Sequence, residues 1–313
     1  MRILVLGGFG FVGGRVAKHL HRAGYSIVLG TRQAYSSPEW LPQAEVVQLH
    51  WHDAAALERG CRGVDVVIHA AGMNAQDCAA DPVSALEFNG LATARLLAAA
   101  IRTGVQRFIY LSTAHVYASS LVGTITENTC PRNLHPYATS HLAGEYAVLA
   151  AGQRGQIQGI VLRLSNAFGA PVSKEANCWM LLVNDLCRQA AETGELKLHT
   201  AGTQLRDFIT LEDVARAVLH VLQVEPTRLG DGLFNLGGDA VESVFSMTEA
   251  VAARWNALTG KDLPIIRPDP SGPLPEPLNY SSKKLQSSGF SLTSRAHQEI
   301  DATLSFCMGA FGR

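Results

Sequence analysis

Short apolar runs alternate with longer amphipathic stretches along the first half of the chain. The runs are rich in Val, Ile and Leu without strict alternation, a pattern typical of parallel strands that are covered on both faces. The longer stretches predict helices, for example over residues 84–103 and 137–154. This order predicts a parallel sheet with helices on both of its faces. The predicted strands are residues 2–6, 26–30, 45–49, 64–69, 107–112 and 159–164.

After residue 165 the alternation becomes less regular. Gly260 predicts the end of a helix over 247–259, since glycine commonly follows the last helical residue. Six of the thirteen prolines lie in 263–277. That segment is expected to be extended, because proline fixes φ and cannot donate to a sheet. The other elements predicted here are helices over 178–193 and 211–222 and strands over 196–199, 207–210 and 232–236.

These patterns predict an α/β fold with a Rossmann-type, doubly wound parallel sheet and a smaller C-terminal α/β substrate-binding subdomain. The predicted dinucleotide-binding domain covers residues 1–165, and residues 207–236 return to it. The predicted substrate-binding subdomain consists of residues 166–206 and 237–313.

Composition narrows the class of protein. The chain has 313 residues, of which 47% are hydrophobic and 17% charged, which is typical of a globular protein and not of a disordered one. Its 26 basic and 27 acidic residues leave no strong field to attract nucleic acid or an anionic membrane. Six cysteines without a C-x-x-C pair predict reduced thiols and no metal site. With no signal peptide and no long apolar run, we expect a cytoplasmic protein.

A glycine-rich turn follows the first predicted strand. Gly7, Gly10 and Gly13 give a G-x-x-G-x-x-G spacing, and a helix is predicted over 15–23. Glycines permit a tight turn, and they let backbone N–H groups approach a pyrophosphate at the helix N-terminus. The turn therefore predicts a dinucleotide site, in which Phe11 and Val12 also contact the cofactor.

The end of the second predicted strand bears on the choice of cofactor. Sites selective for NAD usually carry Asp or Glu here, to hold the ribose 2′-hydroxyl. This chain has Thr31 and Arg32 instead. Arg32 could pair with a 2′-phosphate through two hydrogen bonds, or it could be an ordinary surface arginine. We therefore expect NADP(H) as the favoured cofactor and NAD(H) as the alternative.

Further motifs resemble those of the extended short-chain dehydrogenase/reductases, the family of sugar-nucleotide epimerases, dehydratases and 4-keto reductases. They lie downstream of the glycine turn and extend over most of the chain. The motifs are Gly63-Val64-Asp65-Val66-Val67-Ile68-His69-Ala70-Ala71-Gly72, Phe88-Asn89-Gly90, Tyr110-Leu111-Ser112-Thr113-Ala114-His115-Val116-Tyr117, Pro136-Tyr137-Ala138-Thr139-Ser140-His141, Arg163-Leu164-Ser165-Asn166-Ala167-Phe168-Gly169 and Arg206-Asp207-Phe208-Ile209.

The resemblance implies roles for several residues. Tyr137 would move a proton on the sugar oxygen, and Thr113 would hydrogen-bond the same oxygen beside the nicotinamide. The loop Ala70, Ala71, Gly72 and the residue Asn89 would contact the cofactor. The family's lysine, four residues after the tyrosine, is replaced here by His141. Positions i and i+4 share a helix face, so His141 can still point at the cofactor.

Three hypotheses for His141 remain open. It replaces the lysine in a working enzyme, it marks a slow or lost activity, or it packs within the helix. An ordinary imidazole is largely neutral near pH 7, so it would acidify Tyr137 less than a lysine does. The resemblance also implies an Asp-Glu pair after the threonine in dehydratases. Ala114 and His115 stand there instead, which disfavours dehydration.

The predicted substrate is a nucleotide-linked sugar. The resemblance implies that Asn166 and Arg206 contact its sugar or phosphates, and Arg267 is a further candidate that could equally be a surface residue. We expect chemistry at C4, as a 4-keto reductase or a 4-epimerase. The alternative is a dinucleotide-binding protein with impaired catalysis and a regulatory or structural role. By analogy with the family, alanine-rich helices near residues 85–101 and 138–151 predict a homodimer.

Overall fold

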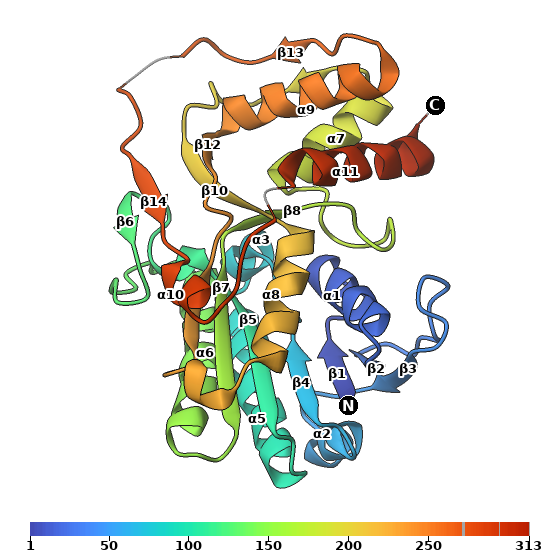
Figure 1. Ribbon diagram of the computed structural model, residues 1–313, viewed down its shortest axis with the longest axis vertical. Helices are drawn as coiled ribbons and strands as arrows, with labels where there is room; N and C mark the ends of the chain where they lie inside the picture. The colour runs from blue at the N-terminus through green and yellow to red at the C-terminus, as the bar shows by residue number, and fades with distance from the viewer. Residues whose placement is uncertain (271–272, 294, 313) are drawn as a thin grey trace.

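A computed structural model describes residues 1–270, 273–293 and 295–312. Its centre is a seven-stranded parallel sheet in the order β11-β7-β5-β4-β1-β2-β3 (Figure 1). Each of these strands aligns in parallel register with its neighbours, as predicted for this fold class. The strands are β1 (Arg2–Leu6), β2 (Ser26–Thr31), β3 (Glu45–Gln48), β4 (Val66–His69), β5 (Arg107–Thr113), β7 (Gln158–Leu164) and β11 (Leu233–Leu236).

Helices cover both faces of the sheet. One apolar core joins one face of the strands to α1 (Phe11–Arg22) and α8 (Leu211–Gln223), whose buried side chains include Val16 and Val218. A second core joins the opposite face to α2 (Ala54–Cys61), α5 (Ala92–Arg102) and α6 (Pro136–Gln153). Residues on both sides of the strands are thus buried, which explains why the strands lack alternation. The prediction of a doubly wound sheet is confirmed.

The remaining elements stand over the carboxyl ends of the central strands (Figure 1). A three-stranded sheet contains β8, β10 and β12, and two smaller sheets pair β9 with β13 and β6 with β14. The helices α7, α9 and α11 share a third apolar core. The bounds are α7 (Leu182–Glu192), α9 (Val244–Thr259), α10 (Lys283–Ser287), α11 (Ala296–Phe311), β6 (Gly123–Ile125), β8 (Asn166–Phe168), β9 (Leu196–Lys197), β10 (Leu205–Thr210), β12 (Val241–Ser243), β13 (Ile265–Ile266) and β14 (Leu278–Tyr280).

The helix predicted over 84–103 is wrong as a single regular element. Asp81 caps α4 (Pro82–Ala85) by accepting from the Ser84 N–H, and a π-helical segment, η1 (Leu86–Leu91), separates α4 from α5. A π-helical turn carries one additional residue, and such turns are frequent at functional sites. Asn89 lies in this segment with its side chain fully buried.

The helix predicted from residue 178 begins at Leu182 instead. Leu181 has an extended backbone, and the residues before it form turns, with the Cys178 carbonyl oxygen accepting from the Leu181 N–H. The end of the 247–259 helix is confirmed, because Gly260 adopts the left-handed conformation at φ 70°. Additional short helices precede η1 or lie between strands, namely α3 (Ala75–Ala80), η2 (Ala114–Val116) and η3 (Pro226–Arg228).

Chain segments cross between the central sheet and the upper part of the molecule. β10 pairs with β8 in the upper sheet, whereas α8 and β11, which follow it, pack against and extend the central sheet. The boundaries at residues 165, 206 and 236 stay a prediction. Among the described residues, no helix is both long and apolar enough to cross a membrane.

Candidate active site

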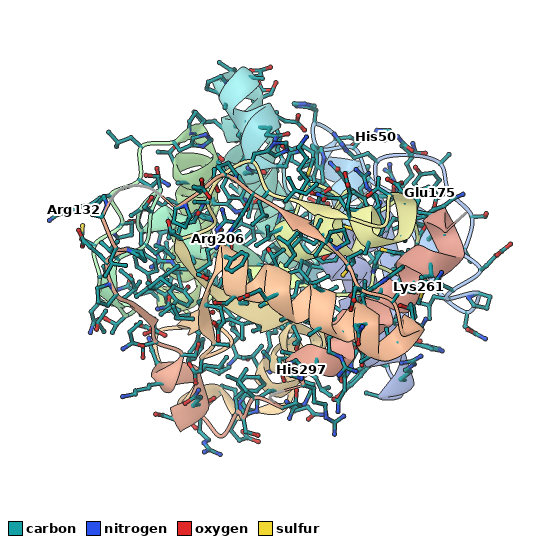
Figure 2. All side chains as sticks on the ribbon, turned by 90° about the horizontal axis from the view of Figure 1, so that it is seen from above. His50, Arg132, Glu175, Arg206, Lys261 and His297 are labelled. Carbon is teal, nitrogen blue, oxygen red and sulfur yellow. The ribbon has the colours of Figure 1, made fainter. Side chains whose placement is uncertain are left out.

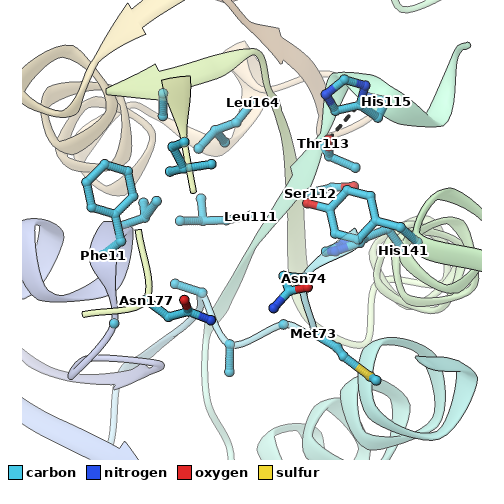
Figure 3. Close-up of a pocket in the computed structure, with 18 of the residues that line it drawn as sticks. Phe11, Met73, Asn74, Leu111, Ser112, Thr113, His115, His141, Leu164 and Asn177 are labelled. Carbon is cyan, nitrogen blue, oxygen red and sulfur yellow. Dashed lines mark hydrogen bonds between the residues drawn. The ribbon is translucent and has the colours of Figure 1, made fainter. Parts of the chain in front are cut away.

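A pocket of about 970 Å³ lies at the carboxyl ends of the central strands. This volume is at the upper end of the range for ligand sites, and the place is where α/β sheets bind their ligands. Figure 3 shows Ser112, Thr113 and His141 on one side of the pocket, with Phe11 and Asn177 on the other. The pocket therefore unites residues from both parts of the molecule.

The glycine turn forms one wall. Gly10 precedes the first residue of α1 and caps it without a side-chain hydrogen bond, and Gly10, Phe11 and Val12 all line the pocket. The N–H groups of this first turn lack intrahelical acceptors, so they are available to an anion. Gly7 and Gly13 do not line the pocket. They shape the turn, since a Cβ at Gly13 would lie 2.2 Å from the Gly7 carbonyl oxygen.

The loop after β4 forms the floor beside this turn. Ala70, Ala71 and Gly72 all line the pocket, as predicted for cofactor contacts. Gly7 has φ +74°, and a Cβ there would lie 2.7 Å from the Ala70 carbonyl oxygen. These two loops pack closely against each other, and the space along the N-terminus of α1 stays open. The residues present therefore fit the pyrophosphate of a dinucleotide.

Asn89 lies behind this floor and not on its surface. Its Oδ1 accepts from the Met73 N–H at 2.8 Å, and its Nδ2 donates to the Ser140 hydroxyl at 3.0 Å. Asn89 is fully buried and does not line the pocket. It therefore connects the loop after β4 to α6, and any effect on a cofactor would be exerted through that loop.

Arg32 lies at the far end of the pocket from Thr113. Its guanidinium carbon is 4.5 Å from the centre of the Phe88 ring, a distance typical of a cation–π contact. Trp51 packs edge-on against Phe88, with ring centres 5.7 Å apart. Arg32, Trp51 and Phe88 all line the pocket, whereas Thr31 does not. This end thus presents aromatic surface beside an exposed positive charge.

The predicted catalytic side chains Thr113 and Tyr137 line the same pocket. Thr113 is the last residue of β5, and its Oγ1 accepts from the His115 N–H at 3.1 Å (Figure 3). Tyr137 lies in the first turn of α6, which begins with Pro136 and is capped by the Nδ1 of His135. Burial raises the pKa of Tyr137, and hydrogen bonding by Thr113 opposes that shift. The phenol is therefore protonated near neutral pH.

His141 lies one turn further along α6 and also lines the pocket. Its ring centre is 4.6 Å from that of Tyr137, with the planes at 69°. Burial lowers the pKa of His141 to about 4, so the imidazole is neutral at pH 7. Unlike the lysine of the related motif, His141 adds no positive charge beside the phenol.

Asn166 and Arg206 form the upper wall. Asn166 begins β8, and its Nδ2 donates to the Asp207 carbonyl oxygen at 2.9 Å. Arg206 projects from β10 into the pocket and lies near the centre of the view from above (Figure 2). Burial lowers the pKa of Arg206, and no acidic group of the described residues opposes this shift. A partly buried arginine without a carboxylate partner favours an anionic ligand.

Arg267 lies outside the pocket. Its Nη1 donates to the Ala201 carbonyl oxygen at 2.7 Å, and its guanidinium carbon lies 3.3 Å from the centre of the Phe245 ring. The structure thus does not bring Arg267 together with Arg206, and its predicted substrate contact stays a prediction. In the described part of the chain, no cluster of His, Cys, Asp or Glu has the arrangement of a metal site.

Sequence reasoning missed several pocket residues. Asn177, Met180 and Leu181 enter from the turns before α7, and Trp51 and His52 enter from the loop after β3. No sequence motif in these segments predicts that they line the pocket.

The family model described as "NAD dependent epimerase/dehydratase family" matches residues 3–237. The chain belongs to this family. It is a family of NAD-dependent enzymes that act on sugar nucleotides, which agrees with the resemblance read from the motifs.

Two relatives illustrate the activities that proteins similar to this chain carry out. The chain is 31% identical over 232 residues to a dTDP-6-deoxy-L-talose 4-dehydrogenase (NAD(P)(+)) of Kitasatospora kifunensis, covering 70% of this chain and 69% of the relative. It is 28% identical over 281 residues to a UDP-glucose 4-epimerase of Azospirillum brasilense, covering 83% and 80%.

A solved structure shares the fold over nearly the whole chain. The UDP-glucose 4-epimerase of Thermus thermophilus, in complex with NAD, superimposes with a TM-score of 0.82 at 24% identity, covering 99% of this chain and 100% of that one. RMD from Pseudomonas aeruginosa, complexed with NADPH, superimposes with a TM-score of 0.79 at 22% identity over 99% of each chain. Members of this fold thus bind either dinucleotide.

Proposed function

We propose that this protein is an NAD(P)-dependent oxidoreductase or epimerase that acts at C4 of a nucleotide-linked sugar. The observation that carries the proposal is one pocket lined by the glycine turn, by Thr113 and Tyr137, and by Arg206. The first relative named above is a 4-dehydrogenase and the second a 4-epimerase of sugar nucleotides, which supports chemistry at C4.

Gly10, Phe11 and Val12 would hold the pyrophosphate with backbone N–H groups, and Ala70, Ala71 and Gly72 would lie under the nicotinamide half. The bound dinucleotide would supply a hydride or accept one. Arg32 would pair with a 2′-phosphate while its other face packs on Phe88. We therefore propose NADP(H) as the preferred cofactor and NAD(H) as the alternative.

Thr113 and Tyr137 would act on the sugar oxygen. Thr113 would hold that oxygen by a hydrogen bond, and the phenol of Tyr137 would give it a proton as the carbonyl is reduced. The raised pKa of Tyr137 and the neutral His141 keep the phenol protonated, which suits proton donation better than abstraction. This favours a 4-keto reductase over a 4-epimerase, because an epimerase must also remove the hydroxyl proton.

The wall that carries Arg206 would receive the diphosphate of the nucleotide. Arginine binds phosphate oxygens with a planar fork of donors, and Asn166 on the same wall and Asn177 before α7 add side-chain amides to the pocket. Dehydration is disfavoured. The carboxylates that line the pocket are Asp77 of α3 and Glu87 of η1. Neither stands directly after Thr113, because that position is the buried Ala114.

We also propose that the protein is a cytoplasmic homodimer. The outer faces of η1 and α6 expose Leu86, Leu91 and Tyr146, and Val83 lies next to them on α4. Apolar side chains gathered on two adjacent helices favour burial by a second copy. Light scattering of the wild type and of a Leu86→Glu, Tyr146→Glu double variant would test this, since the variant should be monomeric.

The decisive experiment supplies 4-keto-sugar nucleotides with NADPH or NADH and follows oxidation of the reduced cofactor. A 4-keto reductase consumes the cofactor in proportion to substrate, whereas a 4-epimerase converts 4-hydroxy sugar nucleotides without net consumption. Tyr137→Phe should lower kcat/KM by about 10²- to 10⁴-fold with little change in dinucleotide affinity. Equal turnover by this variant would rule out the proton transfer proposed for Tyr137.

The buried neutral His141 favours one second candidate, a dinucleotide-binding protein with impaired catalysis and a regulatory or structural role. A His141→Lys change separates the two. In an impaired protein it should raise turnover, because a cation beside Tyr137 lowers the pKa of the phenol. In an adapted enzyme it should leave turnover unchanged or lower it.

A further inference from the structure

The His141 imidazole has a partner on the side away from the pocket. Its Nδ1 lies 2.8 Å from the hydroxyl oxygen of Tyr110, and the two rings stack with centres 5.8 Å apart at 25°. Tyr110 is 1% exposed and belongs to β5, three residues before Thr113. The contact therefore ties the helix that carries Tyr137 to the strand that carries Thr113.

The proton of this hydrogen bond can be assigned from the surroundings. Burial raises the pKa of Tyr110 well above its usual value, so the phenol keeps its proton, which needs an acceptor. The Thr93 hydroxyl, which donates to the Asn89 carbonyl oxygen at 2.6 Å and lies 2.9 Å from the Nε2 of His69, also interacts with the Tyr110 hydroxyl and opposes this shift of the pKa. The Nδ1 of His141, at 2.8 Å, is the close partner of the Tyr110 hydroxyl, and it can accept that proton when the neutral ring carries its own proton on Nε2.

The opposite edge of the His141 ring faces the cofactor loop. A Cβ placed on Gly72 would lie 3.5 Å from its Cε1 and 3.6 Å from its Nε2, an ordinary packing distance. Gly72 and His141 both line the pocket. An N–H at Nε2 would therefore point into the space above Gly72 and beside Tyr137.

We infer that Tyr110 is a positioning residue, which donates to the Nδ1 of His141 and thereby fixes the proton of this neutral histidine on Nε2. The Nε2–H group then holds a ribose hydroxyl of the dinucleotide, as a donor without charge. This part of the inference rests on the proposed function. The tautomer does not, because it follows from contacts within the protein.

The tautomer can be measured directly in protein labelled with ¹⁵N-histidine. Long-range ¹H–¹⁵N correlation spectra distinguish the two neutral forms of an imidazole, and loss of one set of signals in His141→Gln assigns that ring. We expect the Nε2–H form at pH 7 in the wild type. A charged ring, or a proton on Nδ1, would overturn the inference.

Tyr110→Phe removes the donor and little else. We expect the His141 signals to move to the Nδ1–H form or to a mixture, and the Kd for NADPH, or for NADH if that is the better ligand, to rise by about 2- to 10-fold. Tyr117→Phe is the matched control, since Tyr117 is also buried and its hydroxyl donates to Asn235 at 2.7 Å, away from His141. The control should lose stability but leave the His141 signals and the Kd unchanged.

Unchanged His141 signals in Tyr110→Phe would contradict the positioning role. Failure of the proposed function is a separate result, because it would appear as absent turnover with an Nε2–H tautomer still present. If dinucleotide Kd is the same in wild type and Tyr110→Phe although the tautomer changes, the contact to the ribose is wrong.

Discussion

The guanidinium of Arg163 donates hydrogen bonds to the carboxylate of Glu145 beneath the pocket. Its Nη2 lies 2.6 Å from Oε2, and its Nε lies 3.0 Å from Oε1. Both side chains are almost completely buried, and the Ser112 hydroxyl donates to the same carboxylate. Burial opposes the charge on Arg163, but the pair with Glu145 raises its pKa above the usual value. The pair joins α6 to β5 and β7 directly behind the residues that face the ligand.

Removal of one partner should destabilise the protein strongly. We expect Glu145→Ala to lower the free energy of unfolding by about 3–5 kcal/mol, because it leaves the Arg163 charge buried without a partner. Chemical denaturation measures this. The control is Glu58→Ala, which breaks an exposed pair with Arg102 and should cost at most about 1 kcal/mol. Equal losses in the two variants would contradict the importance of burial.

Acid should destabilise the fold through His141. Its pKa is lowered to about 4 in the folded protein, against 6.5 when unfolded, so the unfolded chain binds the proton more tightly. The stability contribution of the neutral ring is complete above pH 6.5 and is lost as the pH falls toward 4, at up to about 1.4 kcal/mol per pH unit. His69, with a pKa lowered to about 3, adds a loss of the same sign.

A difference between variants isolates the His141 contribution. Asp207, whose burial raises its pKa to about 6, acts in the opposite direction, so the wild-type curve alone mixes several groups. Unfolding free energies of wild type and His141→Gln should be compared from pH 7.5 to 4.5. Their difference should shrink as the pH falls. A pH-independent difference would mean that the pKa of His141 is the same in the folded and the unfolded protein.

Arg32 should determine the choice between the two dinucleotides. Arg32→Ala should weaken NADP(H) binding by about 10- to 100-fold, because a charge-assisted bond to a phosphate is lost, while NAD(H) binding changes little. Titration calorimetry with both cofactors checks this. Arg22→Ala, at the exposed end of α1, is a control for the loss of a surface charge. A similar loss for both cofactors would place Arg32 outside the 2′-phosphate site.

The close packing within the glycine turn leaves no room for a methyl group. Gly13→Ala should lower the unfolding free energy by about 1–3 kcal/mol and abolish dinucleotide binding, because the new Cβ would meet the Gly7 carbonyl oxygen at 2.2 Å. Gly309→Ala in α11 is the control. No atom lies within 4 Å of its Cβ position, so alanine should stabilise that helix by about 0.5–1 kcal/mol.

The central sheet and the glycine turn could be predicted because their signals are local. Val, Ile and Leu runs report burial on both faces, and Gly7, Gly10 and Gly13 must stand at fixed spacing for the turn to close. Motif spacing likewise placed Thr113, Tyr137 and His141, which the structure brings to one pocket.

Other features depend on contacts that the sequence does not report. The π-helical segment at Leu86–Leu91 lies within a longer helical stretch, and Asn89 within it bonds Met73 in the loop after β4 and Ser140 of α6. Arg267 lies next to prolines that fix its backbone but not its direction, and its side chain packs on Phe245. The Tyr110 contact to His141 joins residues 31 positions apart, with no spacing rule to announce it.

Ser165 is the one residue between the end of β7 and the start of β8, and its N–H is bonded to the Leu236 carbonyl oxygen at 3.0 Å. One residue therefore joins β7 to β8, the strand that carries Asn166, and this connection contains no free loop that could act as a hinge. A gene split at this joint would leave each fragment lacking strands that the other supplies. A new sugar preference would therefore have to be introduced by substituting individual side chains of the pocket, because the upper part of the molecule cannot be exchanged as a separate domain.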